Sequence, residues 1–161
     1  MANIHRYRCA LTWTGNSGQG TSSYRAYERS YFITIEGKPT LEGSADAAFR
    51  GDASRHNPED LFLASIASCH MLWYLHLAAD AGIAVVAYID RPEGTMEEDA
   101  NGGRFTGVHL TPQVSITAHG LSGATEERAR ALHREAHAKC FIANSVNMPI
   151  TCMPTITTVT A

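Results

Sequence analysis

The feature that most constrains the fold is an uninterrupted apolar segment that begins at Asn57. Asn57 can cap a helix, Pro58 fits the first helical position, and Glu59 and Asp60 complement the positive end of the helix dipole. The segment LFLASIASCHMLWYLHLAADA then continues without a helix breaker until Gly82, a residue type that commonly follows a helix C-terminus. We therefore predict one helix of about 24 residues, or about 36 Å in length.

This helix has almost no polar face. Its large apolar side chains are Phe62, Ile66, Leu72, Trp73, Leu75 and Leu77. A helix that is apolar all round is buried all round, and one domain of 161 residues can hardly cover it alone. We therefore expect a homodimer that buries the helix. No run of about 18 consecutive apolar residues occurs, so we expect no membrane partner and no membrane span.

The remaining segments predict an α+β fold in a single domain over residues 1–161. Patterns typical of strands occupy residues 4–13, 24–36, 83–98, 104–120 and 150–159. A turn or loop is predicted at 15–23, a long surface connection at 37–55, and a hairpin turn at 101–103. A second helix is predicted at about 124–139.

Composition excludes several classes of protein. The net charge of −3 and the lack of a Lys/Arg cluster argue against nucleic acid as a partner. The N-terminal sequence MANIHRYRC has no apolar core of a secretory signal, so we expect a cytoplasmic protein. Its four cysteines contain no CxxC spacing, which disfavours a zinc ribbon and favours free thiols.

Two of the four cysteines are candidates for chemistry. Cys69 lies in the middle of the long helix, where it is either a small packing residue or a reactive thiol. Cys140 follows the second helix, whose negative end disfavours a thiolate, so Cys140 would react second if it reacts at all. Cys9 and Cys152 are interpreted as packing residues. The inward stripe that precedes Cys140 consists of Ala129, Leu132 and Ala136.

The sequence around both thiols resembles a known family. NPEDLFLASIASCHM is similar to the central-helix motif of the OsmC/Ohr thiol peroxidases, in which Asn-Pro-Glu opens the helix and a cysteine follows ten residues after the glutamate. AHAKCFIANSV resembles the second-cysteine motif of that family and contains Cys140. The resemblance implies an OsmC-like fold with antiparallel sheets around a long buried central helix, in an intertwined homodimer.

The resemblance also implies a reaction. Family members reduce organic hydroperoxides as part of an oxidative stress response, with a peroxidatic cysteine that becomes a sulfenic acid and a resolving cysteine that condenses with it to a disulfide. Cys69 would be the peroxidatic thiol and Cys140 the resolving thiol. A dithiol reductant, a dihydrolipoyl protein in family members, would restore both thiols. No cofactor and no metal are expected.

Two further residues complete the expected site. Ten residues of helix span about 15 Å, so Glu59 would serve Cys69 of the partner subunit; otherwise Glu59 only complements the helix dipole. The arginine that the family carries after the first strand is missing from GNSGQG. Arg25 or Arg29, which share one face if they lie in a strand, would replace it, and we favour Arg25 because it is nearer the loop.

Two alternatives remain open at this point. Without that arginine, the protein would be a catalytically inactive relative that binds an apolar small molecule in a pocket at the dimer interface. His133 and His137 with Cys140 have a spacing that would hold a metal ion on one helix face.

Overall fold

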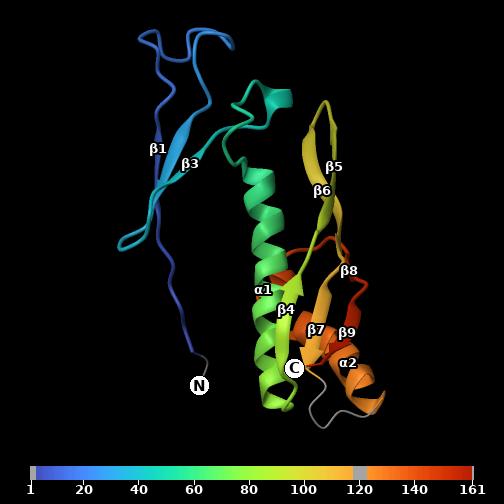
Figure 1. The fold of residues 1–161 in the computed structure, drawn as a ribbon. Helices are drawn as coiled ribbons and strands as arrows, with labels where there is room; N and C mark the ends of the chain where they lie inside the picture. Colours follow the sequence, from blue (N-terminus) through green and yellow to red (C-terminus); the bar gives the residue numbers. More distant parts are fainter. Residues whose placement is uncertain (1–2, 118–122, 161) are drawn as a thin grey trace. The chain divides into compact units, whose positions relative to one another are not determined.

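The computed structural model describes residues 3–117 and 123–160 (Figure 1). The chain divides into two compact units, residues 1–61 and residues 62–161. The last three residues of the predicted strand 104–120 lie outside the described residues. The single domain over residues 1–161 stays a prediction.

The first unit contains a three-stranded antiparallel sheet in the order β1-β2-β3. Its strands are β1 (Ala10–Trp13), β2 (Tyr31–Thr34) and β3 (Leu41–Gly43), followed by the short 3-10 helix η1 (Ala47–Phe49). The predicted strands at 4–13 and 24–36 are therefore too long at their N-terminal ends. The predicted surface connection contains a strand and a helical turn, which the sparse apolar pattern of the segment did not reveal.

The long helix α1 spans Pro58–Asp80, close to its predicted bounds. Asn57 caps it: the Asp60 backbone N–H donates to Asn57 Oδ1 at 2.7 Å, and the Asn57 N–H donates to Asp60 Oδ2 at 3.3 Å. Gly82 has a left-handed φ of 70° just beyond the helix, as predicted for a C-terminal cap. Both ends of α1 therefore follow from local sequence.

Only one face of α1 is buried. The buried residues recur every fourth position, and they are Ile66, His70, Tyr74 and Ala78. Leu72, by contrast, keeps 62% of its surface exposed. One chain therefore leaves part of the helix uncovered, as expected, and burial of the remaining side in a homodimer stays a prediction.

α1 also bears on the membrane prediction. By length and composition alone it is apolar enough to cross a bilayer, although no run of consecutive apolar residues suggested this. This is weak evidence for a membrane span, because the core helix of a soluble protein passes the same test. The buried face of α1 includes the polar residues His70 and Tyr74, which pack within the second unit.

In the second unit, each of the three predicted strand segments is divided at a proline. Pro92 separates β4 (Val85–Ile89) from β5 (Glu93–Asp99), and Pro112 separates β6 (Gly102–Leu110) from β7 (Gln113–Thr117). Pro154 likewise separates β8 (Ile150–Cys152) from β9 (Thr155–Val159). Proline has no N–H to donate to a neighbouring strand, so a ladder is interrupted where it occurs.

The two halves of each divided segment enter different sheets. One sheet has the order β4-β7-β9 and the other has the order β5-β6-β8. The pairs β4–β7 and β5–β6 are antiparallel, but β6–β8 and β7–β9 are parallel. The fold is α+β, as predicted, and the expected antiparallel pairing holds except for β8 and β9, which pair in parallel with their neighbours. The predicted hairpin is confirmed as the turn between β5 and β6.

The second helix, α2, spans Gly123–Lys139 and packs on β9 and on the C-terminal half of α1. Its predicted inward residues, Ala129, Leu132 and Ala136, are fully buried. They join a core that also includes Tyr74 and Ile156. A smaller core of Ile66, Val108 and Leu110 lies between α1 and the sheet β5-β6-β8. The short 3-10 helix η2 (Ala143–Ser145) follows α2.

Candidate functional site

The structure brings Cys69 and Cys140 together in the second unit. Cys69 lies on α1 and is half-buried, whereas Cys140 directly follows α2 and is fully buried. Burial, and then a side-chain hydrogen bond with Cys69, raise the pKa of Cys140 to about 11. The Ala143 backbone N–H, which donates to Cys140 Sγ at 3.4 Å, acts in the opposite direction. At neutral pH Cys140 is therefore a protonated thiol beside Cys69.

Each cysteine of this pair has an aromatic residue nearby in the sequence, and the two aromatic rings contact each other. Trp73 lies one helical turn after Cys69, and its ring centroid is 5.5 Å from that of Phe141 in a T-shaped arrangement. Lys139 Nζ lies 5.6 Å from the centroid of the Trp73 ring. Phe141 keeps 67% of its surface exposed. The neighbourhood of the thiols is thus apolar, with one cation at its edge.

Glu59 lies in the first turn of α1, ten positions before Cys69 on the same continuous helix. The helical rise over ten residues is about 15 Å, so Glu59 lies too far along the helix to contact Cys69 of its own chain. Glu59 Oε2 is buried and has no hydrogen-bond partner among the described residues. Burial, and then the negative charge of Glu59, raise the pKa of Tyr31. Glu59 is therefore partly buried, and its role toward Cys69 of a partner subunit stays a prediction.

The structure corrects the prediction for the two arginines. Arg25 is exposed in a turn, and Arg29 also precedes β2, so the two do not share a strand face. The guanidinium of Arg29 donates hydrogen bonds to the carbonyls of Tyr24 and Tyr27 and lies over both rings, 4.4 and 4.2 Å from their centroids. Arg29 therefore stabilises its own loop, and of the two arginines Arg25 is the exposed one.

Sequence reasoning overlooked one more cation of the first unit. Arg55 forms ion pairs with Glu42 at 3.1 Å and with Asp52 at 3.4 Å. Its Nη1 is buried and lacks a hydrogen-bond partner among the described residues. The only sequence signal was its position four residues before Glu59, which is too weak to single it out.

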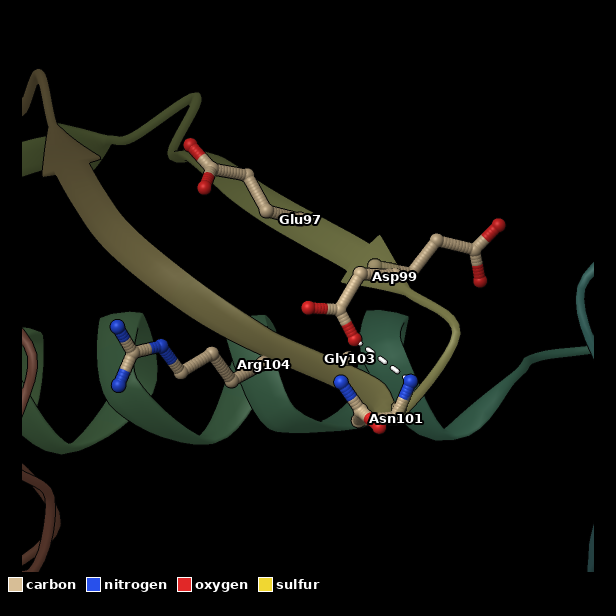
Figure 2. A pocket seen from close by; sticks show the side chains of 7 residues that line it. Glu97, Asp99, Asn101, Gly103 and Arg104 are labelled. Carbon is tan, nitrogen blue, oxygen red and sulfur yellow. Dashed lines mark hydrogen bonds between the residues drawn. The ribbon is translucent and has the colours of Figure 1, made fainter.

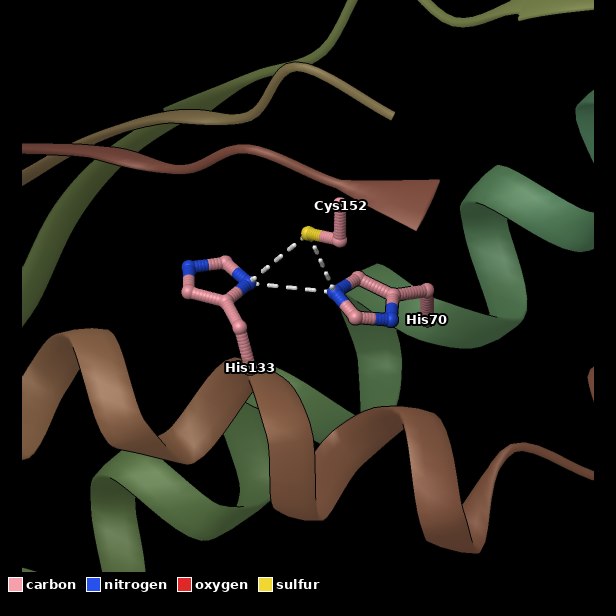
Figure 3. Close-up of side chains that lie close together, drawn as sticks. All are labelled: His70, His133 and Cys152. Atoms are coloured by element: carbon pink, nitrogen blue, oxygen red, sulfur yellow. Dashed lines mark hydrogen bonds between the residues drawn. The ribbon is translucent and has the colours of Figure 1, made fainter. Parts of the chain in front are cut away.

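A second cluster of reactive side chains lies in the second unit (Figure 3). His70 Nε2 on α1 is 3.0 Å from His133 Nδ1 on α2. Cys152 Sγ, at the end of β8, is 3.6 Å from His70 Nε2 and 3.9 Å from His133 Nδ1. Burial is the main cause that lowers the pKa of His70 to about 4 and that of His133 to about 3, so both rings are neutral at pH 7.

This cluster replaces the metal site that the sequence suggested. Within residues 3–117 and 123–160, the group of ligand types that converges is His70, His133 and Cys152, and His133 does not join His137 and Cys140. The interpretation of Cys152 as a packing residue misses this contact, because the three side chains come from elements far apart in the sequence. Cys9 is exposed, so the interpretation of it as a packing residue is wrong for this chain.

A hollow at the tip of the β5–β6 hairpin is unrelated to the thiols (Figure 2). It is lined by Glu97, Glu98, Asp99, Asn101, Gly102, Gly103 and Arg104, all of which are exposed. The Asn101 backbone N–H donates to Asp99 Oδ1 at 2.7 Å and closes the turn. This hollow contains none of the residues that the sequence predicted for catalysis.

Comparison with known proteins identifies the class to which this fold and thiol pair belong. Residues 51–153 match the sequence profile of the OsmC-like proteins, so the chain belongs to the OsmC-like family. No curated protein sequence shows significant similarity.

Solved structures extend the likeness to nearly the whole chain. An OsmC-like protein of unknown function from Vibrio cholerae superimposes with a TM-score of 0.84 at 27% identity, covering 94% of this chain and 100% of that one. An organic hydroperoxide resistance protein from Elizabethkingia anophelis has a TM-score of 0.62 at 21% identity, with 96% and 99% coverage. An OsmC organic hydroperoxide resistance protein from Legionella pneumophila has a TM-score of 0.61 at 19% identity, with 96% and 99% coverage.

Proposed function

We propose that this protein is a thiol-dependent peroxidase that reduces organic hydroperoxides through Cys69 and Cys140. The observation that carries the proposal is the pairing of these two thiols, in which the buried Cys140 is hydrogen-bonded to Cys69. Membership of the OsmC-like family supports it, as do the names of several structural relatives as hydroperoxide resistance proteins.

The first step makes Cys69 the nucleophile. Its thiolate attacks a peroxide oxygen of ROOH, the O–O bond breaks, and the leaving alkoxide takes a proton to become the alcohol ROH. Cys69 is oxidised to a sulfenic acid, the first product on the cysteine oxidation ladder.

The second step uses Cys140 as the resolving thiol. Its sulfur attacks the sulfenic sulfur of Cys69, a disulfide forms, and the hydroxyl leaves as water with the thiol proton. A dithiol reductant, such as a dihydrolipoyl group on a partner protein, then returns both cysteines to thiols and becomes a disulfide itself. The raised pKa of Cys140 supports this order, because a protonated thiol does not compete with Cys69 for peroxide.

The catalytic site in this proposal is completed by a second copy of the chain. Glu59, and Arg25 as the cation, would act on Cys69 of the partner subunit in a homodimer. The support for the dimer is the exposed apolar side of α1, on which Leu72 keeps 62% of its surface accessible. A cytoplasmic location fits the need to keep both thiols reduced.

The proposed substrates are bulky apolar hydroperoxides. Trp73 and Phe141 present aromatic surface close to Cys69 and Cys140 in the sequence and in space. Burial of an apolar substituent against these rings would stabilise a substrate such as cumene hydroperoxide, and hydrogen peroxide lacks any such substituent.

The test is consumption of cumene hydroperoxide and of hydrogen peroxide with dihydrolipoamide as reductant. We expect faster turnover of cumene hydroperoxide, complete loss in Cys69→Ser, and loss of turnover in Cys140→Ser with a sulfenic acid that dimedone traps on Cys69. The exposed Cys9 gives the control, because Cys9→Ser should keep the full rate.

Mass spectrometry supplies the second readout. One equivalent of cumene hydroperoxide should produce an intramolecular disulfide between Cys69 and Cys140. Unchanged thiols after that treatment would overturn the proposal in favour of a catalytically inactive protein that binds an apolar small molecule. Replacement of Arg25 by alanine then measures whether that residue supports the rate.

A further inference from the structure

We propose that His70, His133 and Cys152 form a binding site for one transition-metal ion, with Zn²⁺ as the preferred ion (Figure 3). Each residue contributes one ligand atom, and the three atoms lie within 4.8 Å of one another. Figure 3 shows the two imidazole nitrogens and the sulfur directed toward a common point between α1, α2 and β8.

The separations between the three atoms fit a zinc ion. With Zn–N bonds of about 2.0–2.1 Å and a Zn–S bond of about 2.3 Å, tetrahedral angles place two nitrogens about 3.3 Å apart and a nitrogen and sulfur about 3.6 Å apart. The observed distances are 3.0 Å between the two nitrogens, and 3.6 and 3.9 Å from the sulfur to each. An ion at the centre needs only small shifts of the side chains.

The surrounding protein holds the two rings in place. His70 and His133 are 1% and 2% exposed, and their rings stack at a centroid distance of 5.3 Å. The Tyr74 ring also stacks on His133, at a centroid distance of 3.9 Å, and restricts the orientation of that ring. Rings that are already fixed lose little conformational freedom when they bind an ion, which favours binding.

The donor set is typical of zinc and of related borderline ions rather than of magnesium or calcium. Two neutral imidazoles and one thiolate suit Zn²⁺, Co²⁺ and copper, whereas Mg²⁺ and Ca²⁺ require oxygen ligands. On binding, the Cys152 thiol loses its proton and the sulfur bonds to the ion. Three protein ligands leave the fourth tetrahedral position of zinc to a water molecule or a small ligand.

The proposed metal site uses different side chains from the thiol pair. His70 follows Cys69 directly in α1, and consecutive residues of a helix point about 100° apart, so the two side chains face different directions. Cys140 has its own contacts with Cys69 and Ala143. An ion bound by α1, α2 and β8 would link three elements that are distant in sequence, and it would stabilise the folded state by mass action.

The experiment is titration of untagged, metal-stripped protein with Co²⁺ under anaerobic conditions, with Cys69 and Cys140 kept as reduced thiols. We expect one Co²⁺ per chain, visible d–d bands of tetrahedral cobalt, a near-ultraviolet thiolate-to-cobalt band, and displacement of all of these by one equivalent of Zn²⁺. Zn²⁺ should also raise the melting temperature of the wild-type protein.

Matched variants identify the thiol that binds. Cys152→Ser should lose the thiolate-to-cobalt band, whereas Cys69→Ser and Cys140→Ser should keep it. His133→Gln should weaken cobalt binding at least tenfold and provides a second test if Cys152→Ser folds poorly. The absence of tetrahedral cobalt bands in the wild type, or a thiolate band that survives in folded Cys152→Ser, would overturn the proposal. Since none of these readouts measures peroxide, they are independent of the proposed peroxidase activity.

Discussion

Replacement of Leu72 by alanine tests whether a second copy of the chain covers the exposed side of α1. Leu72 keeps 62% of its surface accessible in the single chain, on a helix that is apolar on almost every side. In a monomer the substitution removes only the contacts of the smaller, covered part of the side chain, so the free energy of unfolding should fall by no more than about 1 kcal/mol.

The expected effect in a dimer follows from the exposed fraction. Complete burial of a leucine side chain contributes about 1.5–3 kcal/mol, so burial of the remaining 62% contributes about 1–2 kcal/mol per chain. A symmetric dimer buries two copies, which gives about 2–4 kcal/mol. The dissociation constant of the dimer should therefore rise roughly 30- to 700-fold in Leu72→Ala.

Sedimentation equilibrium measures this constant, and urea unfolding at two protein concentrations measures the coupled stability. The dimer should make the unfolding midpoint of the wild type depend on concentration, and Leu72→Ala should reduce both the midpoint and that dependence at low concentration. Leu132→Ala is the matched control, because Leu132 is fully buried within its own chain. It should lose about 2–5 kcal/mol at every concentration.

Two outcomes would refute the reasoning. The wild type would have to be a monomer at tens of micromolar, or Leu72→Ala would have to leave the dissociation constant unchanged. In either case the exposed side of α1 is not the interface between two copies of this chain.

Two further predictions concern stability. Asn57→Ala removes the hydrogen bonds of Asn57 with the Asp60 backbone N–H and with Asp46 Oδ2, so the free energy of unfolding from urea denaturation should fall by about 1 kcal/mol, whereas Asn57→Ser, whose hydroxyl can still cap the helix, should lose less. The second concerns Cys140, whose pKa is raised from 9.0 to about 11 in the folded state. The unfolded chain therefore loses the thiol proton at a lower pH than the folded chain, and the free energy of unfolding should fall as the pH rises from 9 to 11. Denaturation under reducing conditions should show that Cys140→Ser reduces this alkaline loss of stability, by at most about 2 kcal/mol. Cys9→Ser is the control and should leave the loss unchanged. Equal pH dependence in Cys140→Ser and wild type would contradict the raised pKa of Cys140.

Local sequence signals determined the two long helices. The cap at Asn57, the proline at the first helical position and Gly82 fixed α1 to within a residue or two, because these residues act on the backbone next to them. The stripe of Ala129, Leu132 and Ala136 gave the inward face of α2 for the same reason, since helical periodicity places them on one side. The two cysteine motifs also lie in the sequence, and they indicate the OsmC-like family without reference to the fold.

Strand organisation depended on interactions between distant residues. The predicted strands continued through Pro92, Pro112 and Pro154, and only the pairing showed that each proline marks the passage from one sheet to the other. The prediction that Arg25 and Arg29 lie in a strand was wrong because the conformation there also depends on contacts that the residue types do not reveal. Cation–π contacts and carbonyl hydrogen bonds around Arg29 hold the chain in a turn where the residue types favoured a strand.

The sequence by itself thus determined the two helices and the two cysteine motifs, because each of these depends on residues within a few positions of one another. Only the tertiary structure decided that His70, His133 and Cys152 meet, since their positions in α1, α2 and β8 are 63 and 19 residues apart. It also decided which side of α1 the chain covers. Burial against distant elements cannot be read from a helix whose sides are all apolar, because every side is an equally good candidate for the core.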